Sequence, residues 1–161
     1  IRNNFKSIIY FDVHTFSRGV DNKMKREFRP ISGIKEWLAC INILQCNESE
    51  LKTIVQYQNE INSAEKILSL GPNILIITKG NRGAQVYYRV NGEVKNLFVK
   101  AVRVNSVNKI GCGDIFGAVF FYTYISTNNI LVSLNAANKA GATAASRNDL
   151  TSHPEIELND R

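Results

Sequence analysis

The chain has 161 residues, of which 44% are hydrophobic and 21% are charged. This length fits one domain of ordinary size or part of a larger one, and this composition excludes an intrinsically disordered chain. The formal net charge of +6 is compatible with binding to anions, including phosphates. The longest apolar run, from Ile115 to Ile125, is too short to cross a bilayer, so we expect no membrane segment.

The three cysteines are an odd number without the spacing of a metal site. This pattern favours free thiols in a reducing compartment, so we expect a cytoplasmic protein. No signal peptide is predicted, and the absence of an initiator Met leads us to expect a processed or truncated chain. The basic stretch from Arg18 to Arg29 has few aromatic residues, which predicts a solvated loop, a lid or a partner contact. Nucleic-acid binding is not expected there, because it needs stacking side chains between the cations.

The first half of the chain alternates predicted strands with predicted helices. An apolar run predicts a buried strand over 7–13, and a polar connection over 14–30 follows it. Ser32 is placed to cap the next helix, which turns Trp37 and Leu38 inward. The later elements are a strand over 41–46, helices over 48–59 and 63–70 with Gly71-Pro72 as a stop, and a strand over 73–78.

The second half begins with a predicted hairpin. Strands over 84–90 and 93–99 are joined by Asn91-Gly92, which is a strong turn signal. A β-branched stretch over 99–104 predicts a strand that leads to a glycine-rich turn. The helix after that turn is apolar on most of its surface, which predicts burial. Ser133 is placed to cap a last helix that reaches residue 146, and the residues from 148 onward are polar and peripheral.

Strands that alternate with helices predict an α/β domain. We expect a largely parallel sheet flanked by helices, with an antiparallel hairpin at one edge. In open α/β sheets, ligands bind beyond the carboxyl ends of the strands. Three segments lie at such ends: Asn47-Glu48-Ser49-Glu50, the stretch from Thr78 to Gly83, and the glycine-rich turn. Their convergence predicts a functional site at that edge of the sheet.

The glycine-rich turn reads Gly111-Cys112-Gly113-Asp114 and precedes a helix. Glycine lets the backbone approach a ligand closely, and the first N–H groups of a helix have no internal partner. A phosphate is a natural occupant of such a place. The helix dipole favours the ionised form of Asp114, which could accept a proton from a substrate hydroxyl. The turn therefore predicts an anion pocket with a base beside it.

Each of these segments also has a purely structural interpretation. Glycine-rich turns before helices are common, and an aspartate there can simply match the helix dipole. Asn47 with Glu50 has the form of a capping box, and Thr78 to Gly83 can be an ordinary turn. Cys112 lies where a helix N-terminus would stabilise a thiolate, which makes a nucleophile conceivable, although it can also be a small residue in a tight turn.

The segments together resemble the C-terminal half of a ribokinase-type (PfkB family) carbohydrate kinase. The family signature Asp-Thr-x-Gly-Ala-Gly-Asp corresponds to residues 108–114. The family's Asn-x-x-Glu matches Asn47 and Glu50, and its Thr-x-Gly-x-x-Gly matches Thr78, Gly80 and Gly83. Its Ala-Asn-x-Ala segment matches residues 137–140, which include Asn138. The resemblance spans about residues 8–146.

This resemblance implies ATP-dependent phosphorylation of a hydroxyl group on a sugar or a sugar-like substrate. It implies that Asp114 is the base and that the N–H groups of Gly111, Cys112 and Gly113 hold the transferring phosphate. Asn47 and Glu50 would place Mg²⁺, directly or through water. The nucleotide site would be formed by Thr78, Gly80, Gly83 and Asn138, although Asn138 also lies in a small-residue surface suited to close helix packing.

Two departures from the family pattern bear on this interpretation. The leading aspartate of the signature is Asn108 here, followed by Lys109, so we expect Lys109 to supply local positive charge and K⁺ dependence to be absent. The N-terminal half, with the lid and most sugar contacts, has no counterpart in residues 1–161. We expect that half to be missing, or a partner chain to replace it, and an exposed sheet edge to result. A non-catalytic nucleotide-binding or interaction module is the competing hypothesis.

Overall fold

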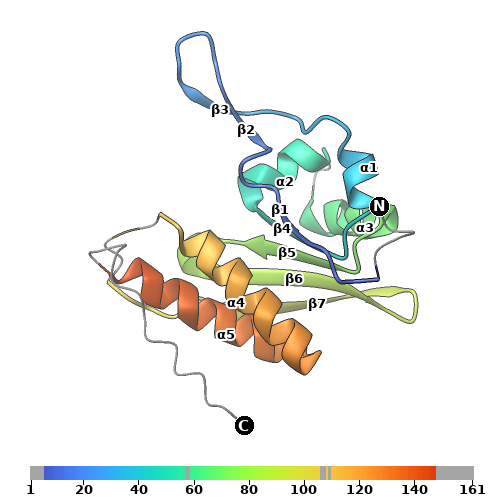
Figure 1. Ribbon diagram of the computed structural model, residues 1–161, viewed down its shortest axis with the longest axis vertical. Helices are drawn as coiled ribbons and strands as arrows, with labels where there is room; N and C mark the ends of the chain where they lie inside the picture. The colour runs from blue at the N-terminus through green and yellow to red at the C-terminus, as the bar shows by residue number, and fades with distance from the viewer. Residues whose placement is uncertain (1–5, 57–58, 106–107, 109, 148–161) are drawn as a thin grey trace.

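A five-stranded mixed sheet forms the centre of the computed structural model, which describes residues 6–56, 59–105, 108 and 110–147 (Figure 1). The strand order is β1-β4-β5-β6-β7. Strands β1, β4 and β5 are parallel, whereas β6 and β7 run antiparallel to their neighbours. The strands span Tyr10–Asp12 (β1), Ile43–Asn47 (β4), Ile74–Thr78 (β5), Gly83–Val90 (β6) and Glu93–Lys100 (β7). The expected α/β class with an antiparallel hairpin at one edge is confirmed.

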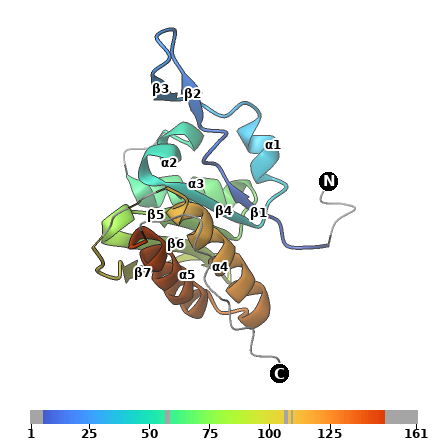
Figure 2. The same ribbon diagram turned by 60° about the vertical axis from the view of Figure 1, so that its left-hand side comes forward.

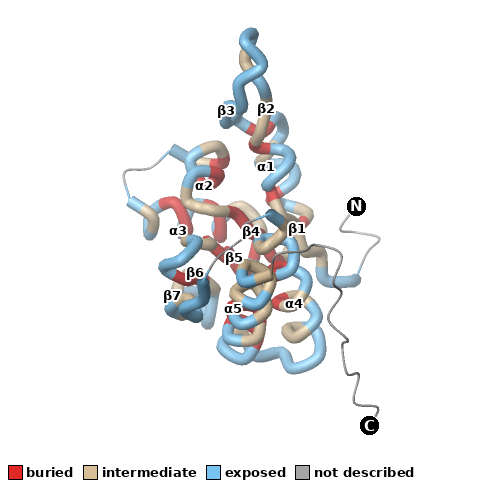
Figure 3. The backbone as a smooth tube through the Cα atoms, turned by 90° about the vertical axis from the view of Figure 1, so that its left-hand side faces the viewer, coloured by how far each residue is buried: buried red, intermediate tan, exposed pale blue. Residues whose placement is uncertain are grey.

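Helices cover both faces of this sheet (Figure 2). Alternate residues of each central strand point to opposite faces, so Leu44 and Cys46 belong to one core cluster and Ile43 to the other. The first cluster packs under α1 (Ile34–Leu38), α2 (Glu48–Ile54) and α3 (Glu60–Leu70). The second packs under α4 (Cys112–Thr127) and α5 (Ile130–Ala145). Figure 3 shows the buried segments concentrated in the central strands and in the helix faces that contact them.

The strand register brings the expected segments to one edge of the sheet. Asn47, at the end of β4, is paired with Thr78, at the end of β5. Asp12, at the end of β1, is paired with Gln45. The segments after these strands therefore meet where the three parallel strands end, as the alternation of elements predicted.

The prediction of a plain polar connection over 14–30 is wrong in part. Strands β2 (Arg18–Val20) and β3 (Arg26–Phe28) form a separate antiparallel hairpin within it, which projects from the rest of the molecule (Figure 1). The Asp21 carboxylate accepts hydrogen bonds from the backbone N–H groups of Lys23 and Lys25, which orders the turn. Strands of three residues carry too few side chains to show a periodic pattern, so no strand signal is visible in this part of the sequence.

Three local predictions about helices are also wrong. The cap before α1 is Gly33 in a left-handed conformation with no side-chain hydrogen bond, not Ser32. The cap of α5 is Asn129, whose side chain accepts from the N–H of Val132, whereas Ser133 lies inside the helix. Trp37 does not face inward: it is 44% exposed and stacks on Phe11, while Leu38 is buried.

The expected strand over 99–104 is wrong in its second part, because β7 ends at Lys100. Residues 101–105 have no regular structure and α4 begins only at Cys112, so the glycine-rich turn does not directly follow β7. The predicted burial of α4 is also only partly right. Phe116, Gly117 and Phe120 are buried, whereas Ile115, Tyr122 and Ile125 are 40–61% exposed.

This arrangement leaves one side of strand β1 and part of the apolar surface of α4 exposed. Strand β1 is paired only with β4, so its other side is an open sheet edge among the described residues. The exposed apolar side chains of α4 lie on the helix that contacts β1, since Tyr10 and Phe121 pack with ring centroids 5.5 Å apart. The expected exposure of an edge and of apolar surface is confirmed. Within the described ranges, no helix has the length and apolar character needed to cross a membrane.

Candidate functional site

The glycine-rich turn forms the N-terminus of α4. Gly111 is the N-cap residue and has φ 76°, a left-handed conformation that favours glycine. Gly113 and Asp114 lie in the first helical turn and are exposed. A Cβ atom added to Gly111 or to Gly113 would meet no heavy atom of the described chain within 4 Å. Both glycines therefore border open space at the end of the helix.

Gly113 is informative because nothing in the fold demands a glycine there. Its backbone is not in a positive-φ conformation, and its neighbourhood has room for a side chain. A glycine inside a helix costs about 0.5–1 kcal/mol relative to alanine. Close approach of a ligand to the backbone is a physical reason to keep glycine at such a position. The free N–H groups of this turn are suited to an anion.

Gln45 attaches this turn to the sheet. Its side-chain nitrogen donates to the backbone carbonyl of Gly113 at 3.1 Å and to the Asp12 carboxylate at 2.7 Å. Its side-chain oxygen accepts from the Tyr10 hydroxyl at 2.6 Å. Gln45 is only 2% exposed. The bridge places the glycine-rich turn beside the carboxyl ends of β1 and β4.

Burial shapes the ionisation of the groups around this bridge. Desolvation raises the pKa of the Tyr10 hydroxyl, and the nearby Asp12 and Asp114 carboxylates add to that rise. Desolvation also raises the pKa of Asp12, although its hydrogen bonds from the His14 backbone and from Gln45 oppose that shift. Tyr10 therefore acts here as a neutral hydrogen-bond donor rather than as an acid or base.

The Asn47 and Glu50 pair forms the capping box that the structural interpretation predicted. Asn47 Oδ1 accepts from the N–H groups of Ser49 and Glu50 at 2.9 Å each, and Glu50 Oε2 accepts from the N–H of Asn47 at 2.9 Å. Glu50 is 2% exposed, and its Oε1 lies 3.1 Å from His14 Nδ1 and 3.4 Å from Arg18 Nη2. Both carboxylate oxygens of Glu50 thus have partners inside the protein.

These contacts decide how the pair could serve a magnesium ion. Mg²⁺ prefers oxygen ligands and retains several waters in proteins. Direct coordination by Glu50 would replace a contact to His14, Arg18 or the Asn47 backbone. No cluster of three or more carboxylate, histidine or cysteine side chains suited to a metal occurs among the described residues. Asn47 and Glu50 supply oxygen donors of the kind that Mg²⁺ prefers, and their protein partners favour an ion held through intervening water.

The segment from Thr78 to Gly83 makes the short connection between β5 and β6. It contains a single 3₁₀ turn at Gly80–Arg82, and the N–H of Lys79 donates to the carbonyl of Gly83 at 2.8 Å. A Cβ atom on Gly83 would lie 2.0 Å from the Val99 carbonyl oxygen, so packing alone requires glycine there. Gly80 has φ 58° and open space around it. Of these two glycines, Gly80 is the one free to approach a ligand.

Charged residues beside this connection neutralise one another. Lys79 Nζ lies 2.5 Å from Glu60 Oε2 and 3.6 Å from Glu48 Oε1. Arg82 forms an ion pair with Glu48. The Tyr87 hydroxyl donates to Glu60, and burial raises the pKa of Tyr87. This network fixes the connection against α2 and α3.

Two further predicted site residues have structural partners. The Asn138 side chain, 9% exposed, donates to the backbone carbonyl of Lys100 at 2.6 Å and so attaches α5 to the end of β7. Burial raises the pKa of the Cys112 thiol, whose Sγ lies 3.5 Å from the Asn108 carbonyl oxygen. This burial disfavours a thiolate at Cys112 and so favours the interpretation of Cys112 as a small residue in a tight turn. Lys109 lies outside the described residues.

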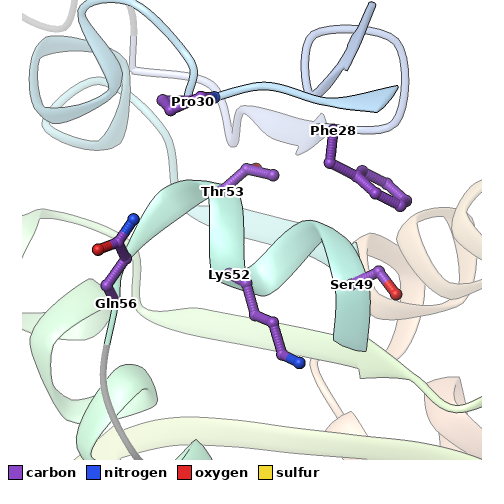
Figure 4. A pocket seen from close by; sticks show the side chains of 6 residues that line it. All are labelled: Phe28, Pro30, Ser49, Lys52, Thr53 and Gln56. Atoms are coloured by element: carbon purple, nitrogen blue, oxygen red, sulfur yellow. The ribbon is translucent and has the colours of Figure 1, made fainter. Parts of the chain in front are cut away.

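Two surface cavities lie away from the glycine-rich turn. One, of ≈390 Å³, opens between the β2–β3 hairpin and α2, with Phe28 and Pro30 on one side and Thr53 facing them (Figure 4). The other, of ≈350 Å³, lies between α2 and α3. Of the predicted segments, only 47–50 reaches these cavities, through Ser49 in the first and Glu48 in the second. Gly113 and Asp114 of the glycine-rich turn line neither cavity and are exposed at the surface.

Sequence reasoning missed four residues that surround the candidate site: Asp12, His14, Arg18 and Gln45. The first three lie at the end of β1 or in the connection that was interpreted as a solvated stretch. Gln45 offered one signal, since it and Asn42 are the two polar residues in the otherwise apolar run 41–46. A buried polar side chain in a strand must find partners, which is a reason to expect a specific contact.

Relatives of this chain are sugar kinases by their descriptions. It is 28% identical over 122 residues to an ATP-dependent ribose-1-phosphate kinase of Halopiger xanaduensis, covering 76% of this chain and 38% of that protein. It is 27% identical over 117 residues to a deoxyribokinase of Salmonella typhi, covering 69% of this chain and 37% of that protein. The chain therefore spans less than half the length of these curated relatives.

Solved structures share the fold. The ribokinase of Arabidopsis thaliana, determined with ribose and ATP, superposes with a TM-score of 0.69 at 22% identity, over 88% of this chain and 42% of that one. At this identity the likeness concerns the fold alone. The model of the pfkB family carbohydrate kinases matches residues 14–156, which include the Gln45 strand, both glycine-containing segments and the helices α4 and α5. This match covers most of the sequence, and the chain belongs to the pfkB carbohydrate kinase family.

Proposed function

We propose that residues 1–161 form the C-terminal, nucleotide-binding part of an ATP-dependent sugar kinase. The protein would transfer a phosphoryl group to a hydroxyl of a sugar or sugar-like substrate. Membership of the pfkB family and the descriptions of the curated relatives support this reaction class. Phosphoryl transfer needs positioned charge more than covalent chemistry, and an exposed helix N-terminus at a sheet edge suits that need.

The observation that carries the proposal is the open first turn of α4. A Cβ atom on Gly113 would meet open space among the described residues, and its neighbour Asp114 is exposed in the same first helical turn. The backbone N–H groups of Gly111, Cys112 and Gly113 would hold the transferring phosphate. Asp114 would accept the proton of the attacking hydroxyl. A base and an anion site would then lie at one point of the molecule.

The other predicted residues would complete the nucleotide side of the site. Thr78, Gly80 and Gly83 would border the nucleotide where β4 and β5 end, and Asn138 would lie near the base while it keeps α5 attached to β7. A magnesium ion would neutralise phosphate charge when bound. Asn47 and Glu50 would hold it through water, since their oxygens already have protein partners.

The exposed surface supports the expected loss of an N-terminal half. The open side of β1 and the apolar side chains of α4 are the surfaces that further strands and a partner layer would cover. The relatives are more than twice as long as the region that they share with this chain. That missing half, or a second copy of the chain, would supply the lid and most of the contacts to the sugar.

The test uses the complete gene product that contains this sequence. ATP consumption is measured across a panel of sugars, sugar phosphates and nucleosides, for the wild type and for Asp114→Asn. The expected result is turnover on at least one acceptor, its loss in Asp114→Asn, and nucleotide binding that is equal in both proteins by calorimetry. Turnover that persists in Asp114→Asn would exclude the proposed base.

One observation favours a second candidate, a non-catalytic nucleotide-binding or interaction module. Both oxygens of Glu50 and the side chain of Asn138 are engaged in contacts that maintain the fold. A module of this kind would bind ATP and would not consume it with any acceptor. The acceptor panel separates the two candidates, because nucleotide binding without turnover in the wild type would support the module.

A further inference from the structure

The amide side chain of Gln45 makes three hydrogen bonds at one place and so uses both of its N–H donors. Its oxygen accepts from Tyr10, and its nitrogen donates both to Asp12 and to the Gly113 carbonyl. Three partners around one buried amide fix its position and its orientation. Two of the partners belong to β1, the neighbouring strand, whereas Gly113 belongs to α4 on the face of the sheet.

A second contact holds the same part of α4 against the sheet. A Cβ atom on Gly117 would lie 2.2 Å from the Tyr10 hydroxyl oxygen and 3.2 Å from Gln45 Oε1. Only glycine at this buried position lets the Tyr10 and Gln45 pair reach the helix. The first turns of α4 therefore meet the sheet through a polar contact at Gly113 and a close packing contact at Gly117.

We propose that Gln45 is a positioning residue for phosphoryl transfer. It holds the first turn of α4, and with it Asp114 and the N–H groups of the glycine-rich turn, at the carboxyl ends of β1 and β4. Gln45 also lies two residues before Asn47 on the same strand, so one rigid strand aligns the glycine-rich turn with the start of α2. This inference rests on the proposed kinase function.

The main test replaces the amide without changing its length much. In the complete gene product, Gln45→Met removes all three hydrogen bonds. The expected result is a fall in kcat of about 100-fold with a much smaller change in the KM for ATP, because a misplaced base and anion site act mainly in the transition state. Amide hydrogen exchange in the first turn of α4 should become faster in the same variant.

The matched control is Gln85→Met. Gln85 Nε2 also makes two hydrogen bonds, to Asn96 Oδ1 and to the Leu97 carbonyl, but on β6 and away from α4. This variant should lose some stability while it keeps kcat and the exchange rates of α4. Equal losses of kcat in the two methionine variants, measured where both are folded, would overturn the positioning role.

A double substitution separates stability from positioning. The double variant Gln45→Glu with Asp12→Asn exchanges the amide and the carboxylate between the two positions. The amide at position 12 can donate to the carboxylate at position 45, and the Tyr10 hydroxyl can still donate to that carboxylate. The carbonyl of Gly113, however, loses its donor. The pair should regain stability relative to Gln45→Glu alone and should not regain kcat. Recovery of kcat would contradict the role of the Gly113 contact.

If Gln45→Met fails to fold, Tyr10→Phe replaces it in the comparison with Gln85→Met. Tyr10→Phe removes one of the three hydrogen bonds of Gln45 and should lower kcat more than Gln85→Met does.

Different results would contradict the kinase function and the positioning role of Gln45. A wild-type protein without turnover on the acceptor panel would contradict the kinase function. The exchange measurement needs no turnover, so unchanged exchange of the α4 first turn in Gln45→Met would contradict the positioning role by itself.

Discussion

Two glycines of helix α4 are there for opposite physical reasons. A side chain at Gly113 would point into open space, whereas a side chain at Gly117 would collide with the Tyr10 hydroxyl. Residue identity alone does not separate these cases, since both are glycines four positions apart on one helix. Only the neighbours show that packing requires glycine at position 117 and that Gly113 borders open space.

The contrast predicts opposite results for two alanine substitutions. Gly113→Ala should leave the free energy of unfolding unchanged or raise it by up to about 1 kcal/mol, because alanine is the better helix former. It should nevertheless weaken nucleotide binding and turnover. Gly117→Ala should destabilise the protein by about 1–3 kcal/mol through overpacking. Chemical unfolding and calorimetric titration with ATP measure both effects. Unimpaired nucleotide binding in Gly113→Ala would contradict the anion site.

The carboxylate of Asp12 predicts a pH dependence of stability. Its pKa is raised above the ordinary 3.8 because burial disfavours the charged form. Between 3.8 and the raised value, the folded chain keeps a proton that the unfolded chain has released, so its contribution to stability falls as pH rises. Asp12→Asn removes this dependence.

The measurement compares unfolding of the wild type and of Asp12→Asn in urea across the acid range. The stability of the wild type relative to the variant should decline as pH rises above about 3.8 and then level off. A relative stability that instead increases with pH would mean that the hydrogen bonds from Gln45 and His14 dominate over desolvation.

At the scale of elements, Asn47 at the start of helix α2 has an observed role as N-cap and a proposed role in holding Mg²⁺. Substitutions can separate these two roles. Asn47 caps α2, and in the proposed site it also lies where a hydrated Mg²⁺ would be held. Asn59 caps α3 in the same manner, by accepting from the N–H of Asn62. Both asparagines are therefore N-caps, Asn47 within a capping box and Asn59 with one N–H partner, and they differ in proposed function.

Asn47→Ala and Asn59→Ala should each destabilise the protein by about 0.5–2 kcal/mol, the usual effect of a lost N-cap. Only Asn47→Ala should also raise the Mg²⁺ concentration needed for half-maximal turnover. Thermal unfolding and magnesium titrations of activity provide the two readouts. Equal magnesium requirements in both variants would assign Asn47 to the cap alone.

The elements show what the sequence could and could not predict. The strands over 43–47 and 74–78 and the hairpin at Asn91-Gly92 were predictable, because long apolar runs and a specific turn signal encode them. The β2–β3 hairpin was not, since its strands are too short for periodicity. The contacts of Glu50 with His14 and Arg18 span more than 30 residues, and no local pattern encodes such a pairing.

The local motifs of the candidate site were predictable from the sequence, whereas the tertiary contacts between them were not. Glycine-rich turns and capping boxes are local, so residues 47–50 and 111–114 could be chosen from the sequence. The role of Gln45 depends on which face of β4 it occupies and on where α4 crosses that face. Both are results of tertiary packing, which a single sequence does not display.

At the scale of the whole molecule, the surface around β1 is apolar on both sides. Phe16 and Trp37 are 51% and 44% exposed on one face, and Tyr122 and Ile125 are 61% and 52% exposed on the other. Contiguous apolar surface beside an open strand edge promotes association with other chains. We expect the complete protein to cover this surface and residues 1–161 alone to self-associate.

We predict that charged substitutions on this apolar surface have opposite effects in residues 1–161 alone and in the complete protein. Tyr122→Lys with Ile125→Lys should reduce self-association of residues 1–161 and should destabilise the complete protein, because the proposed N-terminal half would then bury these charges. Light scattering and thermal unfolding report the two effects. Val90→Lys, at a 41% exposed position next to the β6–β7 turn, is the control and should change neither form. If the double substitution reduced self-association of residues 1–161 and left the complete protein as stable or more stable, the proposed covered surface would be contradicted.

The bridge at Gln45 has a further consequence for the order of folding. Gln45 is 35 residues from Tyr10 and 68 residues from Gly113 along the chain, whereas β6, β7 and the α4–α5 pair join segments that are neighbours in sequence. Contacts between distant segments form late, since closing long loops costs entropy. The glycine-rich turn should therefore reach its final place only after the sheet exists. Its opening should be among the least costly local unfolding events of the domain.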